Sequence, residues 1–317
     1  MNPATTVRSL DDVDLGDRRL HLAIGMFDGV HLGHQSVIEA AVHSARARRA
    51  VAGVLTFWPH PSVLFRPDNP TRQIMDPKSK VRLFRELGAE LVIEQPFDER
   101  FAAVTAESFM RYLRERLPGL DSIYVGENWR FGKGRAGDVS LLVTLARQEG
   151  VNVVSMPRLH FNGEAVSSSR IREALTEGRL EEANSLLGRF YFTEESVAAG
   201  RGLGRKIGFP TLNLPWDGNL RPRYGVYGVR VREAEKPGAD WYRGVANFGV
   251  RPTVDPVAAE PVLEVHVLEG SCPFDAGDRL FVEWRFFIRP ESRFQGVDEL
   301  KARIARDCDE ALRRFST

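Results

Sequence analysis

The chain has 317 residues, of which 43% are hydrophobic and 27% are charged, and its 44 lysines and arginines face 43 aspartates and glutamates. This length predicts two domains. Because the charges nearly balance in each half, no nucleic-acid partner is expected and any phosphate site must be local. Two cysteines without metal-type spacing, a polar amino-terminal segment and the lack of a long apolar run predict a cytoplasmic protein with no membrane partner. We expect a monomer or a weak homo-oligomer.

In the first half of the chain, up to about residue 180, short β-rich runs alternate with helical patterns. This alternation predicts βα units around a parallel sheet, an α/β fold. The helix expected over 33–49 repeats apolar residues at helical spacing, which gives it a face that can pack on the sheet. The β-rich runs are 20–27, 51–57, 89–94, 122–126 and 151–156, and the other helical patterns are 78–87, 106–117 and 139–148.

The second half has a different pattern, in which glycines and prolines separate short β-rich runs at 225–233, 241–249, 261–270 and 279–288. This pattern predicts a small antiparallel barrel or sandwich, closed by one helix over about 297–314. A helical connector is expected over 172–189. We therefore predict two domains, residues 1–184 and residues 185–317.

The stretch GMFDGVHLGHQ, Gly25 to Gln35, lies between the first expected strand and the first expected helix. Such a helix start offers unpaired backbone N–H groups and the positive end of the helix dipole, which together attract phosphate. His31 and His34 would project from the same face and donate hydrogen bonds to phosphate oxygens, and Gly33 lets a phosphate approach the backbone. The alternative is that one histidine caps the helix and the other is solvated.

The segment FDGVHLGH resembles the H-x-G-H signature of the nucleotidylyltransferase superfamily. Further segments follow in order: VLTFWPHP, VGENWRFGKGRAGD, VSSSRIREAL, GRGLGRKIGFPTLNL, GVANFGVRPTV and LEVHVLEG. Over nearly the whole chain this series resembles the bacterial bifunctional riboflavin kinase/FMN adenylyltransferases, often called FAD synthetases. The resemblance implies a Rossmann-like adenylyltransferase domain with a parallel sheet and a small β-barrel riboflavin kinase domain with a C-terminal helix. It also implies riboflavin, FMN and ATP as small-molecule substrates, Mg²⁺ as cofactor, and FMN and FAD as products.

For adenylyl transfer, the resemblance implies that His31 and His34 hold the ATP phosphates, while Gly25 and Asp28 shape the turn around the nucleotide. In this reaction the FMN phosphate attacks the α-phosphorus of ATP and pyrophosphate leaves. No covalent enzyme intermediate is needed, so positioning and charge stabilisation should carry the catalysis.

The segment SSSRIR, Ser167 to Arg172, lies where the family has its second phosphate motif. The resemblance implies that Ser168, Ser169 and Arg172 bind ATP. A serine N-cap followed by solvated Arg170 and Arg172 explains the segment equally well.

The segment ENWRFGKG resembles the flavin side of the adenylyltransferase site, with Asn128 as a polar contact and Trp129 or Phe131 as a packing or stacking surface. Burial in the core is the simpler role for its aromatic residues. Trp58, Trp129 and Ser169 depart from the family pattern. The two tryptophans leave the details of the flavin pocket open, whereas serine keeps the hydroxyl of the usual threonine.

The glycine-rich segment GRGLGRKIGFPTLNL begins the kinase half. Its glycines free the backbone to wrap phosphates and its basic residues supply charge, so Gly202, Gly204 and Lys206 are expected to bind ATP. PTLN resembles the kinase motif Pro-Thr-Ala-Asn. By that match Thr211 and Asn213 bind Mg²⁺ and the ATP phosphates, since a hydroxyl and an amide oxygen are suitable ligands.

Glu264, in LEVHVLEG, matches the catalytic base of the family. Its apolar neighbours alternate with it, so on a strand it lies on the opposite face, and it could also be only an outward-facing strand residue. FIRPESRF, residues 287–294, resembles the flavin-covering loop, with Arg289 and Phe294 as flavin contacts. Arg289 and Arg293 could equally be solvated.

Overall fold

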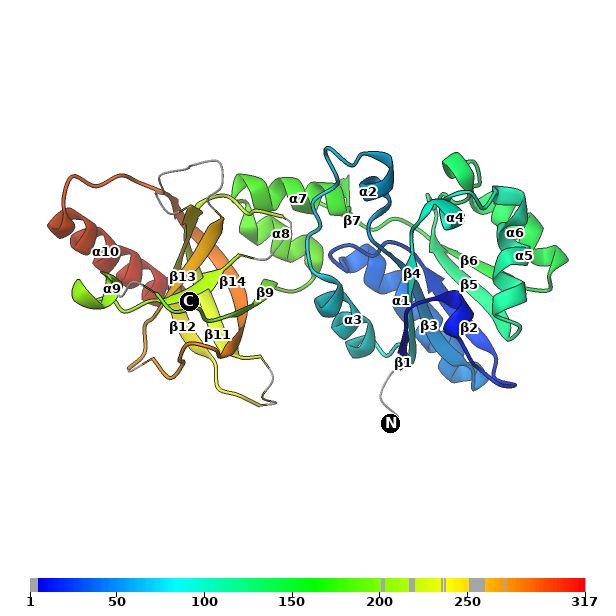
Figure 1. The fold of residues 1–317 in the computed structure, drawn as a ribbon, viewed down its shortest axis with the longest axis horizontal. Helices are drawn as coiled ribbons and strands as arrows, with labels where there is room; N and C mark the ends of the chain where they lie inside the picture. Colours follow the sequence, from blue (N-terminus) through cyan, green and yellow to red (C-terminus); the bar gives the residue numbers. More distant parts are fainter. Residues whose placement is uncertain are drawn as a thin grey trace. The chain divides into compact units, whose positions relative to one another are not determined.

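The computed structural model describes residues 5–200, 203–216, 220–234, 236, 238–250, 260–270 and 272–316. The chain divides into two compact units, residues 1–168 and residues 169–317. The first is an α/β unit with a parallel sheet and the second is an antiparallel β unit with a C-terminal helix, so the predicted fold class is confirmed (Figure 1).

The first unit is built on a six-stranded parallel sheet with the strand order β1-β4-β3-β2-β5-β6. The sheet extends from β2 through β3 and β4 to one edge and through β5 and β6 to the other. The carboxyl end of β2 is therefore the switch point at which open α/β sheets bind ligands. The strands are β1 Thr5–Val7, β2 Leu20–Ile24, β3 Val51–Trp58, β4 Leu91–Pro96, β5 Leu120–Gly126 and β6 Asn152–Met156.

Helices cover both faces of this sheet (Figure 1). Helix α1 packs against β2, β3 and β5, and its predicted apolar face is buried: Val37, Ile38, Ala41, Val42 and Ala45. The helices are α1 Leu32–Arg48, α2 Pro61–Phe65, α3 Pro77–Glu86, α4 Glu99–Ala102, α5 Ala106–Arg116 and α6 Val139–Gln148; short elements are η1 Leu10–Asp12, η2 Lys133–Arg135, β7 His160–Phe161 and β8 Glu164–Ala165.

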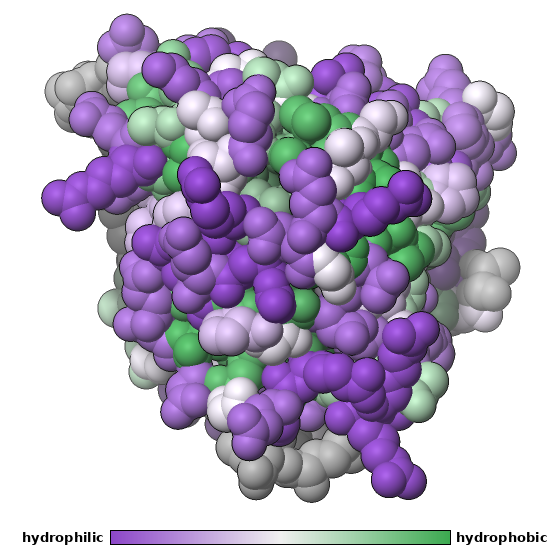
Figure 2. All heavy atoms as spheres, turned by 90° about the vertical axis from the view of Figure 1, so that its right-hand side faces the viewer, coloured by the Kyte–Doolittle hydropathy of each residue, from purple (hydrophilic) through white to green (hydrophobic). Residues whose placement is uncertain are grey.

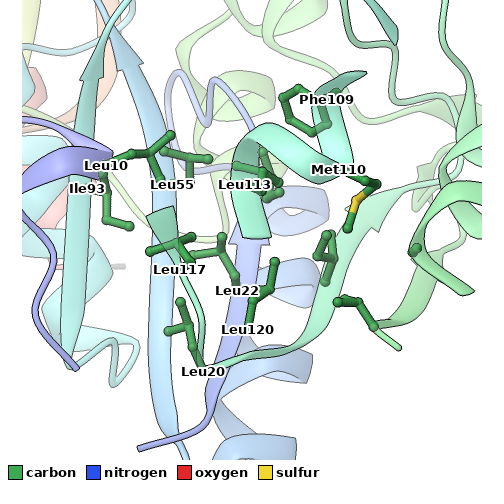
Figure 3. Packing of buried hydrophobic residues seen from close by; sticks show 14 of the residues in the cluster. Leu10, Leu20, Leu22, Leu55, Ile93, Phe109, Met110, Leu113, Leu117 and Leu120 are labelled. Carbon is green, nitrogen blue, oxygen red and sulfur yellow. The ribbon is translucent and has the colours of Figure 1, made fainter. Parts of the chain in front are cut away.

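Leucines of the strands and of α5 form the core on one face of the parallel sheet (Figure 3). Leu20 and Leu22 from β2 meet Leu113 from α5 there, and all three are fully buried. Burying one such side chain contributes about 1.5–3 kcal/mol, so this core fixes the sheet on which the turn after β2 is mounted.

The outer surface of the first unit, seen from the side of α5 and α6, is mostly hydrophilic, with hydrophobic residues in small areas between the polar ones (Figure 2). Within the described part of the chain, no helix has the length and apolar character needed to cross a membrane.

The second unit is an antiparallel half-barrel of six strands. Its strand order is β10-β13-β12-β11-β14-β9, and a bridge between Ala198 and Asn213 joins the end of β9 to β10. Helix α10 packs against β12 and β14, and its Cys308 and Ala311 belong to one buried cluster with Val226 and Val245. The elements are α7 Ser168–Glu177, α8 Leu180–Leu187, β9 Tyr191–Ser196, α9 Leu203–Lys206, β10 Leu212–Pro215, β11 Gly225–Glu233, β12 Tyr242–Val250, β13 Pro261–Val267, β14 Arg279–Pro290 and α10 Val297–Phe315.

The expected connector over 172–189 is two helices, because the chain adopts a left-handed conformation at Gly178, where φ is +79°. Asn184 fastens the second of them, α8, to the barrel. Its amide nitrogen donates to the carbonyl of Trp284 at 3.1 Å, and its amide oxygen accepts from the backbone N–H of Tyr191 at 2.7 Å. The domain boundary predicted after residue 184 stays a prediction, but a cut there would divide α8.

A fragment that begins at Ser169 should therefore be more stable than one that begins at Leu187. The shorter fragment lacks the bonds of Asn184 and the buried side chains of Leu180, Ala183 and Leu186. Removal of one buried leucine side chain alone typically costs about 2–5 kcal/mol. We therefore expect the fragment that begins at Leu187 to have a free energy of unfolding that is lower by at least ~3 kcal/mol. Urea unfolding of the two fragments measures the difference, and coincident curves would show that α8 contributes nothing to this unit.

Candidate functional site

The segment between β2 and α1, residues 25–31, is named the phosphate turn after the role that the sequence predicts for it. Three of its residues have a left-handed backbone: Phe27 with φ +50°, Gly29 with φ +80° and Val30 with φ +39°. A branched residue such as Val30 rarely adopts this conformation. Such a turn persists only where its surroundings hold it, and strained turns of this kind are concentrated at functional sites.

Asp28 fixes the middle of the phosphate turn. Its carboxylate is 2% exposed and accepts from the backbone N–H of Ile74 at 3.0 and 3.2 Å. Its carbonyl oxygen accepts from the hydroxyl of Ser168 at 2.8 Å. Gly25 continues the sheet, since its N–H donates to the carbonyl of Leu55 at 3.1 Å. The turn is thus held to the sheet and to Ser168, the last residue of the first unit.

His31 and His34 lie side by side on one face, as the spacing predicts. Their rings are stacked with centroids 3.6 Å apart and an interplanar angle of 18°. His31 is also the N-cap of α1, and its Nδ1 accepts from the backbone N–H of His34 at 3.3 Å. The capping role that was the alternative for one histidine is therefore present. Because Nδ1 of His31 accepts this bond, the neutral ring carries its proton on Nε2, which is then a hydrogen-bond donor.

Gly33 leaves room for this arrangement, because a Cβ there would lie 3.3 Å from the imidazole of His31. The stacked rings therefore lie where the backbone of α1 begins. The donors of the two imidazoles and the helix N-terminus together form a compact group that can bind an anion.

The SSSRIR segment begins α7, which starts at Ser168. Ser169 is exposed and Arg172 is half-buried. The expectation of a solvated arginine pair is wrong for Arg170, whose guanidinium is 14% exposed and contacts the carboxylate of Glu182 at 2.8 Å. ATP binding by Ser168, Ser169 and Arg172 stays a prediction.

The flavin-side segment is partly core. Phe131 is 5% exposed and its ring packs on Trp129 at 4.9 Å and on Phe109 at 5.0 Å. Burial in the core, the simpler role for this ring, is therefore confirmed. Asn128 is exposed, and its amide faces the guanidinium of Arg158. Flavin contacts of Asn128 and Phe131 remain predictions.

In the second unit, the glycine-rich segment packs against the PTLN motif. Gly202 lies outside the described residues. A Cβ at Gly204 would overlap the carbonyl oxygen of Phe209 and would lie 3.1 Å from the hydroxyl of Thr211, so only glycine fits this close approach. Lys206 ends the short helix α9 and is exposed.

The PTLN motif and the predicted base lie in one row across the barrel. Asn213 of β10 pairs directly with Glu264 of β13, which pairs with Asn247 of β12. Directly paired residues of antiparallel strands point to the same face. The apolar residues next to Glu264 are buried on the other face, as predicted. Asn247 was missed, although its alternation with buried Ala246 and Phe248 is visible in the sequence.

The surroundings of Asn213 and Thr211 fit a divalent cation. A Cβ at Gly200 would overlap the side-chain amide of Asn213, so only glycine lets this amide pack directly on the backbone there. Hydroxyl and amide oxygens are hard donors of the kind that Mg²⁺ prefers. Among the described residues, no group of three or more His, Cys, Asp or Glu side chains is placed to hold a metal ion.

The row continues through Val226 of β11 to Arg289 of β14. The expectation that Arg289 could be solvated is wrong: it is 11% exposed, and its guanidinium donates to both carboxylate oxygens of Asp307 in α10 at 2.7–3.0 Å. It also lies 5.8 Å from the ring centroid of Phe294. Their predicted contacts with flavin stay predictions.

Known proteins resemble both units. Residues 15–170 match the family described as FAD synthetase, and residues 187–315 match the family described as riboflavin kinase. The bifunctional riboflavin kinase/FMN adenylyltransferase of Escherichia coli K12 is 39% identical over 90% of this chain and 90% of its own length. The protein of the same name from Bacillus subtilis 168 is 34% identical over 93% and 92%. A crystal structure described as a macrolide-efflux protein from Streptococcus pneumoniae superposes with a TM-score of 0.84 at 26% identity, covering 96% of this chain and 97% of its own.

Proposed function

Because the chain belongs to the bifunctional riboflavin kinase/FMN adenylyltransferase family, we propose that its two units divide the two steps of FAD synthesis between them. The protein is a transferase that phosphorylates riboflavin to FMN with ATP and adenylylates FMN to FAD with a second ATP. One observation carries the proposed division: the candidate residues for the two steps lie in different units. The stacked histidines belong to the first unit, and the Asn213–Glu264–Asn247 row belongs to the second.

In the proposed adenylyltransferase site, ATP lies with its phosphates on the start of α1. A phosphate oxygen of FMN attacks the α-phosphorus, and the bond from that phosphorus to the bridging oxygen breaks, releasing pyrophosphate. His31 and His34 donate to the oxygens on which negative charge builds up, in a site that is already organised before the reaction. Asp28 and Gly25 hold the turn.

Ser168, Ser169 and Arg172 are proposed to complete the phosphate site at the start of α7. The bond from the hydroxyl of Ser168 to the carbonyl of Asp28 supports the role of Ser168, because both residues belong to the first unit. Asn128 and Phe131 are proposed to lie at the flavin, Asn128 as an exposed polar contact and Phe131 as part of the wall.

In the proposed kinase site, Glu264 accepts the proton of the 5′-hydroxyl of riboflavin as the hydroxyl oxygen attacks the γ-phosphorus of ATP. The bond from that phosphorus to the bridging oxygen of ATP breaks, and ADP leaves. Thr211 and Asn213 would hold Mg²⁺, which neutralises phosphate charge when it is bound. Gly202, Gly204 and Lys206 are proposed to wrap the phosphates. The Arg289–Asp307 pair fixes the start of the segment that ends at Phe294, which supports the proposed role of this segment in covering the flavin.

We also propose that both reactions take place in the cytoplasm. The two cysteines, Cys272 and Cys308, are both free thiols, which a reducing compartment favours. The proposed assembly is a monomer or a weak homo-oligomer.

Incubation with riboflavin, ATP and MgCl₂, followed by chromatography, tests the assignment of both activities to one chain. FMN should appear first and FAD later. A flavin-binding regulator would bind flavin without consuming ATP, and a protein with one decayed site would stop at FMN or use only FMN.

The proposed magnesium site predicts that Asn213→Ala raises the Mg²⁺ concentration needed for half-maximal phosphorylation of riboflavin by roughly tenfold or more, a loss of about 1.4 kcal/mol in binding. Asn247→Ala is the matched control, since it removes the same amide from the same row but two strands away. Titration of both variants with MgCl₂ measures the effect. An unchanged midpoint in Asn213→Ala would remove this residue from the metal site.

A further inference from the structure

A buried lysine lies directly behind the phosphate turn. Lys80 of α3 is 1% exposed, and its ammonium group donates to the carbonyl oxygen of Met26 at 3.2 Å and to the hydroxyl of Thr56 at 3.1 Å. The hydroxyl of Thr56 donates to the same carbonyl at 3.1 Å. Lysine is almost never fully buried unless it is paired, because burying its charge is costly. A long apolar side chain would fill the space at lower cost.

Two buried carboxylates act on this ammonium group, that of Asp28 in the phosphate turn and that of Glu94 in β4. Burial lowers the pKa of Lys80 to about 8, against the opposite influence of the two carboxylates. Lys80 is therefore mostly charged at neutral pH and loses its charge in mildly alkaline solution.

Contacts connect Lys80 with the histidines. The carbonyl that it holds belongs to Met26, directly before Phe27, the first left-handed residue of the turn. The ring of Phe27 meets the imidazole of His34 edge-on, with centroids 5.3 Å apart. Any rotation of the peptide unit between Met26 and Phe27 would therefore move this ring and the start of α1.

We infer that Lys80 is a positioning residue for adenylyl transfer: through the carbonyl of Met26 it holds the phosphate turn in the conformation that presents His31 and His34 to the ATP phosphates. This inference rests on the proposed role of the two histidines. The charge of Lys80 is required because a neutral amine donates a weaker hydrogen bond to the carbonyl of Met26 than an ammonium group does.

The test is the pH dependence of kcat/KM for ATP in the conversion of FMN to FAD, from about pH 6.5 to about pH 9.5. For the parent enzyme we expect a fall above pH 8, since protons leave Lys80 there, and Lys80→Met should lack this fall and be slower by roughly 10²-fold at neutral pH, the scale of a small misplacement. Thr56→Val keeps the ammonium group but removes one of its partners, so the fall should move to lower pH.

Lys78→Met is the matched control, because Lys78 lies on the same helix and is exposed. It should keep the rate and the pH profile of the parent. A flat parent profile, or a Lys80→Met variant within a few-fold of the parent, would overturn the inference. If Lys80→Met does not fold, the pH profiles of the parent and of Thr56→Val still test the inference, since the alkaline fall should lie at lower pH in Thr56→Val. A parent that makes no FAD at all would instead contradict the proposed function.

Discussion

The variant in which His31 and His34 are both replaced by alanine should convert riboflavin to FMN and stop there. The stacked rings bring two donors to one place at the start of α1, and removal of one preorganised donor to a developing charge costs about 10²- to 10³-fold. Loss of both should therefore leave FAD formation barely detectable. The kinase step should be unchanged, since the row with Glu264 belongs to the other unit. Chromatography of flavins over time measures both steps at once.

Two controls separate catalysis from folding in this experiment. His43→Ala removes an exposed imidazole from the same helix and should have no effect. His31→Asn keeps an N-cap side chain for α1, whose loss would cost about 1 kcal/mol, but removes the Nε2 donor. We expect it to be nearly as stable as the parent and strongly impaired in FAD formation. Near-normal FAD output from the double alanine variant would reduce both histidines to a structural role.

Local patterns in the sequence predicted most of the fold because each is set by neighbours along the chain. The helix over 139–148 and the strand over 225–233 have the expected limits, and α1 buries the face that its periodicity indicates. The three-residue strand Thr5–Val7 was missed, since it is defined by its parallel pairing with β4 rather than by any pattern of its own. The break at Gly178 was also missed, because a single glycine is tolerated inside many helical patterns.

In the sites, too, features built from contiguous residues could be predicted, whereas features built from distant segments could not. The phosphate turn could be predicted because its strand, turn and helix are contiguous in the sequence, and its histidines are three residues apart. Lys80 could not, because its partners Met26 and Thr56 come from distant segments. The one signal was a lysine that precedes Leu83 and Phe84 by three and four residues on the apolar face of a helix. Asn247 likewise becomes a neighbour of Glu264 only through strand pairing.

Replacement of Glu264 by glutamine should slow the phosphorylation of riboflavin by about 10²- to 10⁴-fold, the usual contribution of a positioned general base. The 5′-hydroxyl of riboflavin is a poor nucleophile at neutral pH, and the carboxylate of Glu264 is half-buried in the row between Asn213 and Asn247. Glutamine keeps the volume and much of the hydrogen bonding but cannot accept the proton. We therefore expect kcat for FMN formation to fall while the KM for riboflavin and for ATP changes little.

Glu260→Gln provides the comparison, since Glu260 directly precedes the same strand, is exposed and pairs with Arg221 at 3.0 Å. It should phosphorylate riboflavin like the parent. Both variants should make FAD from supplied FMN at the parental rate, because the histidines are in the other unit. If Glu264→Gln stays within a few-fold of the parent, the base lies elsewhere. His266 is then the next candidate, although one of its ring nitrogens is already bonded to the carbonyl of Pro210 at 2.8 Å, which leaves only the other nitrogen to accept a proton.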